Sequence, residues 1–565
     1  MQLIKVCSKA IVLSLVVVTM FAVESAAQQS QLGKVDFPVT GSEQAKAHFL
    51  RGVAALHSFW YEEALEAFRE STRVDPNFMM GYWGEAMAHN HPLWSQQDTE
   101  AAVKALEKIK DTSKLTPRER AYIDAVRVLY GKGDKLTRDI AYSEAMEKLY
   151  RDYPDDLEAA AFYSLSLLGT VRPGDKGFRR QMRAGAIAMD VFQKNPNHPG
   201  AAHYIIHSFD DPEHAILALP AARRYAEIAP EAHHARHMPS HIFLQLGMWP
   251  EAAASNESAW AASDAWVKRK RLSKGLRDYH SLSWLLYVYL QQGRNSKAEE
   301  LLLMMRQSMD EAGGGRLRRT YAYMLATSVI ETQHWELAGR LLTSAEEKAG
   351  GQSADSGEHS AHGAARQSSS GRSTAPPASP YNWYGQSVIL LARGLAAVET
   401  GALAEADKII AELQTVRKQL TDKGEAYDAR QVEIMGLEVN ALASAKRGNN
   451  TGAIQLMKRA TALEEEMSPP SGPPDLIKPS HELFGEILLQ MGRAKEAAQQ
   501  FSVSLLRQPN RARSLLGAAR AAAQSGDRAG AIAAYTNLLQ IWKQADEELP
   551  ELRQARQYLG QASTN

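Results

Sequence analysis

The sequence predicts an all-α protein built from repeated helical hairpins. Small residues, an aromatic residue and a proline recur in the same order along most of the chain, as in Gly52, Ala64, Phe68 and Pro76. The period-two alternation of apolar and polar residues that marks strands is not sustained anywhere in the sequence. Residues 116–119 combine an N-cap threonine, a proline at the first helical position and a glutamate three residues on, which together start a helix.

Composition and charge are those of a folded globular protein. The 565 residues are 44% hydrophobic and 23% charged, which predicts that most of the chain folds. Basic and acidic residues are equal in number, 65 of each. Binding to nucleic acid depends on a surplus of lysine and arginine that neutralises phosphates, so nucleic acid is not expected as a partner.

Residues 1–27 have the composition of a secretory signal peptide. Lys5 and Lys9 precede an apolar run at 10–23, and small residues follow it. The run is short for a membrane span, and an uncleaved membrane anchor is the alternative. We therefore expect a periplasmic or secreted protein with no integral membrane segment after cleavage. The only cysteine, Cys7, lies in this segment, so the mature chain has no thiol for a disulfide, a metal or nucleophilic catalysis.

The recurring residues have fixed roles in a helical hairpin. Small residues let two helices approach closely, the aromatic ring fills the gap between them, and proline ends the second helix. A second complete unit holds Gly485, Ala497, Phe501 and Pro509. This order resembles the tetratricopeptide repeat, which has a period of 34 residues. The resemblance implies a right-handed superhelical solenoid, with the first helix of each hairpin on the concave surface.

The recurring small, aromatic and proline positions also predict the domain organisation. Residues 40–346 form an N-terminal array of repeats, and residues 381–560 form a C-terminal array. Between them, residues 347–380 are rich in serine, glycine and alanine and have almost no apolar side chains to bury, so we expect a disordered linker. Two histidines of this linker, His359 and His362, are expected to be solvated.

Histidines cluster in one part of the chain. Of the 17 in the sequence, seven lie between residues 203 and 241. His203 and His207 are four residues apart, as are His237 and His241, so each pair can share one face of a helix. The two pairs are offset by 34 residues, the length of the repeat. The resemblance therefore implies that all four imidazoles face the concave groove.

This arrangement predicts a transition-metal site, because neutral imidazole is the commonest metal ligand in proteins. Its proposed ligands are His203, His207, His237 and His241, and the ion is copper, zinc, iron or nickel. If no metal binds, no cofactor is expected. Pro239 interrupts the second pair, since proline bends or breaks a helix. Further candidates are the neighbouring His233 and Asp210 and, as a second set, His57, His89, His91 and His280.

The sequence allows three functions. The first is an exported solenoid that binds a ligand in its groove, with a protein or peptide partner elsewhere. The second is a scaffold that grips peptides, in which the histidines contact a peptide or hydrogen-bond between repeats. The third is a metal-dependent enzyme, although phosphate-binding loops, Gly-x-Ser-x-Gly and His-Glu-x-x-His motifs are missing from the sequence and no catalytic residue is assigned. The stretches HHARHMPSHIF, YWGEAMAHNHPLW and LTPRERAYIDA are similar to those of exported bacterial tetratricopeptide proteins, a resemblance that implies fold rather than activity.

Overall fold

The prediction of an all-α fold is confirmed by the computed structural model, which describes residues 30–172, 175, 177–312, 314–341, 381–474 and 476–564. Within these residues the chain is almost entirely helical, and its one sheet pairs β1 (Asn90–His91) with β2 (Gln96–Gln97) in antiparallel register. The predicted signal peptide at 1–27 and the predicted linker at 347–380 lie outside the described residues. Among the described helices, none combines the length and the apolar character that a membrane span requires.

The chain divides into two compact units. The first contains the described residues up to Val171 together with Arg179–Ser208 and Pro220–Met238, and the second contains Arg172–Phe178, Phe209–Leu219 and the chain from Pro239 onward. This division does not coincide with the predicted arrays, because α17 and α19 pack together and the helices on either side of residues 347–380 therefore belong to one unit.

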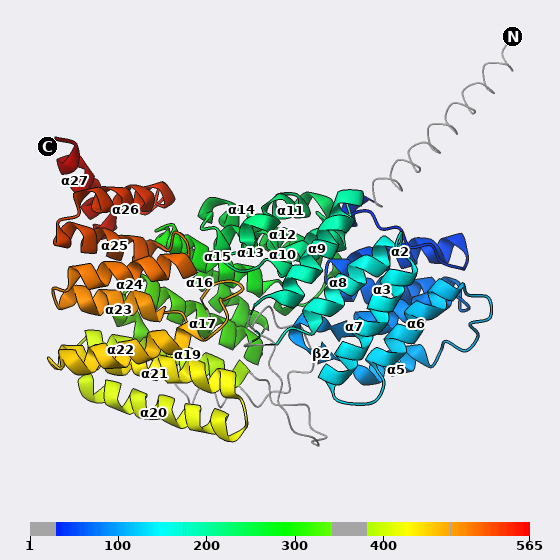
Figure 1. The fold of residues 1–565 in the computed structure, drawn as a ribbon, viewed down its shortest axis with the longest axis horizontal. Coiled ribbons are helices and arrows are strands. Elements are labelled where there is room, and N and C mark those ends of the chain that lie inside the picture. The colour runs from blue at the N-terminus through cyan, green and yellow to red at the C-terminus, as the bar shows by residue number, and fades with distance from the viewer. Residues whose placement is uncertain are drawn as a thin grey trace, which may run out of the picture. The chain divides into compact units, whose positions relative to one another are not determined.

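The first unit is a series of antiparallel helices (Figure 1). Its elements in chain order are η1 (Ser30–Leu32), α2 (Glu43–His57), α3 (Tyr61–Val74), α4 (Met79–Ala88), η2 (Pro92–Trp94) between the two strands, α5 (Thr99–Leu106), α6 (Pro117–Leu129), α7 (Lys135–Asp152), α8 (Leu157–Gly169), α9 (Arg179–Lys194), α10 (Pro199–Ser208), most of α11 (Ala215–Ile228) and α12 (His233–His237). The capping box predicted at Thr116 is present at the start of α6.

The second unit continues the same pattern. Its elements are the first turn of α11, α13 (Pro239–Gln245), α14 (Trp249–Lys270), η3 (Lys274–Leu276), α15 (Tyr279–Gln291), α16 (Asn295–Ala312), α17 (Gly315–Thr332), η4 (Trp335–Arg340), α19 (Tyr381–Glu399), α20 (Leu403–Asp422), α21 (Ala426–Lys446), α22 (Asn450–Glu465), α23 (Ser480–Gln490), α24 (Ala494–Arg507), α25 (Ala512–Ser525), α26 (Arg528–Ile541) and α27 (Pro550–Thr564). Figure 1 shows α20 to α26 stacked in sequence order, from yellow to red.

A phenylalanine wedge explains why glycine and aromatic residues recur. Phe68 is fully buried, and a Cβ atom at Gly52 or Gly84 would come within 2.6 or 2.3 Å of its ring. Real Cβ atoms do not approach so closely, so only glycine on the two flanking helices leaves room for the ring. In the second unit, Phe501 stands in the same relation to Gly485 and Gly517, at 2.7 and 2.3 Å.

The first unit closes on itself. Helix α10 packs against α2, its distant neighbour in sequence, and also against α8. Gly200 permits this contact, because a Cβ atom there would lie 2.4 Å from Nδ1 of His57. Phe37, in the segment before α2, is buried and packs its ring against Phe49 and Trp83 at centroid distances of 5.3 and 5.4 Å. Residues near the start and the end of the unit are thereby brought to one place.

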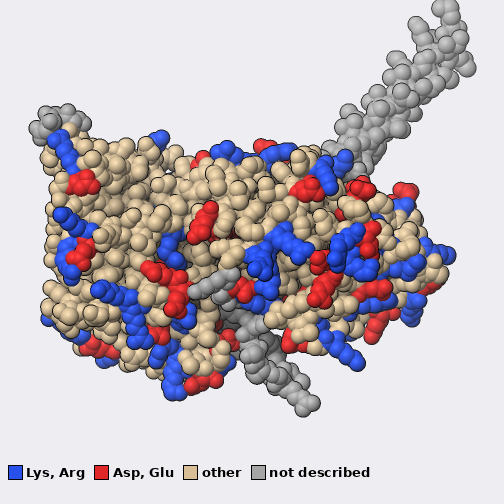
Figure 2. Space-filling view, in the orientation of Figure 1, with Lys and Arg blue, Asp and Glu red and all other residues tan. Residues whose placement is uncertain are grey.

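Charge on the surface is mixed. Figure 2 shows lysine and arginine interspersed with aspartate and glutamate on the face that it draws, as the equal totals of the two signs suggest.

Candidate metal centre

A buried hydrogen-bond network joins α2, α8 and α10 in the first unit. His57 Nε2 lies 2.7 Å from one carboxylate oxygen of Glu158, and His198 Nε2 lies 3.2 Å from the other. The backbone N–H of Asp36 donates to the same carboxylate at 3.2 Å. The side chains of His57, Glu158 and His198 are all completely buried. Three donors therefore surround one carboxylate that has no access to water.

The contacts of the other ring nitrogens fix the roles of the two histidines. His198 Nδ1 accepts a hydrogen bond from the backbone N–H of Ala201 at 3.1 Å, so its Nε2 carries the proton and donates to Glu158. His57 Nδ1 lies 2.8 Å from the hydroxyl of Tyr204 on α10. Although His57, Glu158 and His198 have the composition of a metal-ligand set, all four ring nitrogens are already hydrogen-bonded. This network acts as a structural joint.

Burial and hydrogen bonding set the charges of this joint. Burial lowers the pKa of His57 below its ordinary value and outweighs the opposing effect of Glu158, so the ring is neutral at pH 7. Burial alone raises the pKa of the Glu158 carboxyl, but the two imidazoles outweigh burial and hold that pKa well below its usual range. Glu158 therefore remains ionised.

Three other imidazoles converge beside this joint. His203 and His207 lie one turn apart on α10, and His234 lies in the first turn of α12. The Nε2 atom of His203 is 3.0 Å from Nε2 of His207 and 3.2 Å from Nε2 of His234. One nitrogen from each ring lies within 4.8 Å of the other two. We call these three residues the histidine trio.

The backbone of α2 orients the first member of the trio. His203 is completely buried, and its Nδ1 donates to the carbonyl oxygen of His57 at 2.7 Å. Because Nδ1 carries the proton, Nε2 presents its lone pair to the other two rings. Metal-bound histidines commonly donate their second N–H to a carbonyl or carboxylate in this way. The joint around Glu158 thus places the atom that positions His203.

Aromatic rings enclose the trio. The ring of Phe59 lies 4.3 Å from that of His203 and 5.8 Å from those of His207 and His234, measured between centroids. Tyr225 stacks on His203 at 5.3 Å. Burial and repulsion from the neighbouring histidines lower the pKa of His234 well below its ordinary value, so it is neutral at pH 7. A neutral imidazole is the form that binds a metal.

The distances within the trio fit a transition-metal site. A tetrahedral ion with metal–nitrogen bonds of about 2.1 Å holds its ligand nitrogens about 3.4 Å apart. Two of the separations in the trio, 3.0 and 3.2 Å, are already close to this value. The candidate ligand atoms of His207 and His234 lie within 4.8 Å of each other. Three imidazoles on one ion leave one coordination position for water or an added ligand.

The predicted pair His237 and His241 does not share one helix. Helix α12 ends at His237 and α13 begins at Pro239, since proline lacks the N–H that would continue the helical hydrogen bonds. His237 belongs to the first unit, with its ring centroid 6.2 Å from that of His234, whereas His241 belongs to the second unit. The interruption that Pro239 predicts is therefore present, and the two residues do not lie on one regular helix.

The other histidines predicted as metal ligands lie outside the histidine trio. His233 packs edge-on against Trp60 at 5.9 Å, and His91 stacks on Tyr61 at 3.9 Å. His89 caps the end of α4, where burial lowers its pKa. In the second unit, His241 bonds to Asp210, and His280 lies in the first turn of α15.

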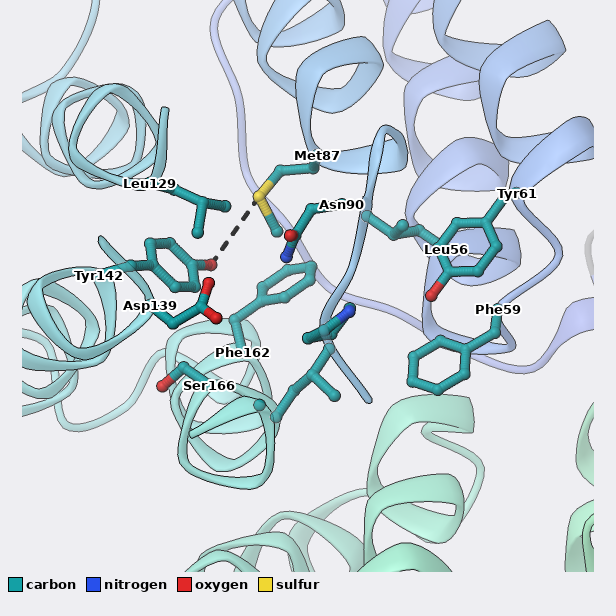
Figure 3. A pocket seen from close by; sticks show the side chains of 13 residues that line it. Leu56, Phe59, Tyr61, Met87, Asn90, Leu129, Asp139, Tyr142, Phe162 and Ser166 are labelled. Atoms are coloured by element: carbon teal, nitrogen blue, oxygen red, sulfur yellow. Dashed lines mark hydrogen bonds between the residues drawn. The ribbon is translucent and has the colours of Figure 1, made fainter. Parts of the chain in front are cut away.

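A small cavity in the first unit lies beside Phe59 and Tyr61. Its far end is lined by Asp139 and Tyr142, and the hydroxyl of Tyr142 lies 3.8 Å from the sulfur of Met87 (Figure 3). The cavity volume is about 20 Å³, which is enough for about one water molecule. It is too small for a peptide or an organic ligand.

His234 was not among the residues predicted from the sequence. Its neighbour His233 was predicted instead, but His233 faces Trp60. The available signal was Pro239, which indicates a helical break after His237 and therefore a short α12.

The fold and the cluster together define an all-α helical-repeat scaffold with a buried histidine site in its first unit. The family model of the tetratricopeptide repeat matches residues 45–78, which include most of α2 and all of α3, so the predicted repeat is confirmed there. A search of curated proteins finds no match.

Solved structures give low similarities spread over much of the chain. A human IFIT1 dimer with PPP-AAAA is 12% identical over 91% of this chain and 99% of that chain, with a TM-score of 0.38. Yeast Tom70 is 10% identical over 92% and 96%, with a TM-score of 0.35. A Rap protein complexed with competence and sporulation factor is 13% identical over 68% and 100%, with a TM-score of 0.33. No functional conclusion depends on these similarities.

Proposed function

We propose that this chain is an exported helical-repeat scaffold whose first unit binds one transition-metal ion through His203, His207 and His234. The observation that carries the proposal is the convergence of their three Nε2 atoms, with separations of 3.0 and 3.2 Å about His203. Nitrogen donors without thiolates favour zinc, copper, nickel or iron. Export to the periplasm or the cell exterior, and a protein or peptide partner elsewhere on the scaffold, belong to the same proposal. Nucleic acid is not an expected partner.

Burial argues against a peptide as the ligand of the trio. His203 has no exposed surface, and α10 packs against α2 beside it. An extended peptide needs a groove that exposes backbone and side chains along several residues. A single ion needs only the three nitrogen atoms.

The proposal predicts that metal is lost when a member of the trio is replaced. Metal-free protein is dialysed against Zn²⁺ or Cu²⁺, and the bound ions are counted by elemental analysis. His207→Ala and His234→Ala, at half-buried positions, are expected to bind one ion fewer than the wild type or to bind it at least about tenfold more weakly, since even outer-shell changes cost about 10–100-fold in affinity. His203→Ala is expected to lose the same ion.

His233→Ala is the matched control, because His233 precedes His234 on α12 but packs against Trp60. Its metal content is expected to equal that of the wild type. Circular dichroism and thermal unfolding test whether each variant is folded. Folded wild-type protein that binds no ion, or trio variants that retain every ion, would show that these histidines form only a hydrogen-bonded cluster.

A further inference from the structure

The second unit holds a separate pair of imidazoles. His241 lies on α13 and His280 in the first turn of α15, and a nitrogen of one ring lies within 4.8 Å of a nitrogen of the other. Trp284, one turn after His280, lies 4.3 Å from the ring of His241 and 5.2 Å from that of His280, between centroids. An aromatic ring thus packs against both imidazoles.

A buried carboxylate orients one of the two rings. His241 Nδ1 donates to Oδ2 of Asp210 at 2.6 Å, and the two side chains are only 1% and 4% exposed. Gln245, one turn after His241, donates to the other oxygen of Asp210 at 3.2 Å and to the backbone carbonyl of Pro470 at 2.6 Å. The carboxylate is therefore fixed from two sides, and the proton of His241 is on Nδ1. Nε2 is therefore the nitrogen of this ring that can serve as a metal ligand.

This arrangement differs from an ordinary histidine–aspartate pair in the same segment of the chain. His214 lies 2.9 Å from Asp211, the residue next to Asp210, but its side chain is 26% exposed. Among the described residues, His214 belongs to no group of converging ligands, whereas His241 and His280 do. Of these two pairs, only Asp210 and His241 combine burial, a fixed carboxylate and a second imidazole nearby. These three features are typical of a histidine that binds a metal and is held by an outer carboxylate.

We propose that the second unit binds a transition-metal ion of its own through His241 Nε2 and a ring nitrogen of His280, with Asp210 as the positioning residue behind His241. Imidazole donors select zinc, copper or nickel over magnesium and calcium, which prefer oxygen ligands. The two histidines supply two of the ligands, and the other coordination positions are filled by ligands outside this pair. This second site uses no residue of the trio, so each site can fail independently of the other.

The test measures ion stoichiometry in the full chain with the trio removed. His207→Ala/His234→Ala is the background, and Zn²⁺ is the probe, counted by equilibrium dialysis and elemental analysis. We expect two ions per chain in the wild type and one in the background. His241→Ala or His280→Ala added to the background is expected to remove the remaining ion, and Asp210→Asn to weaken its binding by about 10–100-fold.

The pair Asp211 and His214 provides the matched control. Asp211→Asn and His214→Ala, added to the same background, are expected to leave the remaining ion bound with unchanged affinity. His241→Gln, closer in size to histidine, replaces His241→Ala if the alanine variant does not fold. A folded background protein without an ion, or one that keeps its ion after both His241 and His280 are replaced, overturns the second site. A wild type whose ions all survive the background substitutions instead overturns the trio.

Discussion

Replacement of Arg511 by alanine is expected to lower the free energy of unfolding of the second unit by about 3–5 kcal/mol, the usual result of removing one partner from a buried ion pair. Arg511 has no exposed surface, and its guanidinium donates to Glu482 through Nε and Nη2 at 2.7 and 3.1 Å. It also lies 2.7 Å from Glu331 and donates to the hydroxyl of Tyr287 at 3.0 Å. These partners lie on α23, α17 and α15, so that one side chain joins three helices to the start of α25.

The expected loss of stability comes from buried negative charge that Arg511 no longer neutralises. Burial raises the pKa of the Glu482 carboxyl, but Arg511 and Lys478 outweigh it and keep that pKa well below its usual range. Without the guanidinium, Glu482 keeps Lys478 at 2.9 Å, but the buried negative charges of Glu482 and Glu331 are less well neutralised, which costs free energy.

Chemical denaturation of the full chain measures the loss, and hydrogen exchange in α23 and α25 locates it in this unit. Arg493→Ala is the control, because its ion pair with Glu496 lies on the surface, where such pairs contribute little. The double variant Arg511→Met/Glu482→Gln is expected to recover part of the stability, since it removes the stranded charge as well. A loss no greater than that of Arg493→Ala would mean that the buried network is not stabilising.

The repeat architecture was predictable because it depends on short-range patterns. The glycine, aromatic and proline positions report how two neighbouring helices touch, and Phe68 and Phe501 perform the same wedge role in the two units. The capping box at Thr116 depends on residues three positions apart, and it too was readable from the sequence. Contacts of this kind repeat wherever the local pattern repeats.

The candidate site was only partly predictable because it depends on long-range closure. The four-residue spacing placed His203 and His207 on one helix, and the structure brings their Nε2 atoms to 3.0 Å. Helix α2 packs against α10 because of the combined curvature of all the hairpins between them. A short sequence pattern does not give that curvature. For the same reason, the carbonyl of His57 as the partner of His203 was not foreseen. His234 was not predicted because its contact with His203 joins two different helices, α12 and α10, and no local pattern gives that contact.

In the first unit, replacement of Glu158 by alanine is expected to cost about 3–5 kcal/mol of unfolding free energy. The change removes the acceptor of two buried donors, His57 Nε2–H and His198 Nε2–H, and of the partly buried backbone N–H of Asp36. Each buried donor left without an acceptor costs about 1–3 kcal/mol. Because His57 also holds His203 through its backbone carbonyl, the affinity of the trio for metal is expected to fall as well. Denaturation of metal-free protein measures the first effect, and dialysis against Zn²⁺ measures the second.

The pH dependence of stability distinguishes the contribution of the Glu158 charge from the contribution of its size. The pKa of Glu158 is lower in the folded than in the unfolded chain, so the stability that it supplies is complete above the unfolded value of about 4.5 and is lost as the pH falls through the folded value. His57 is buried in its neutral form, and the unfolded chain takes up a proton there below about pH 6.5, so the stability of the unit begins to fall at that higher pH.

Glu158→Gln keeps the size of the side chain but cannot titrate. The stability difference between wild type and Glu158→Gln should therefore shrink as the pH falls below about 4.5. A difference that persists unchanged to pH 3 would assign the effect to packing and show that the carboxylate is not the charged centre of the joint.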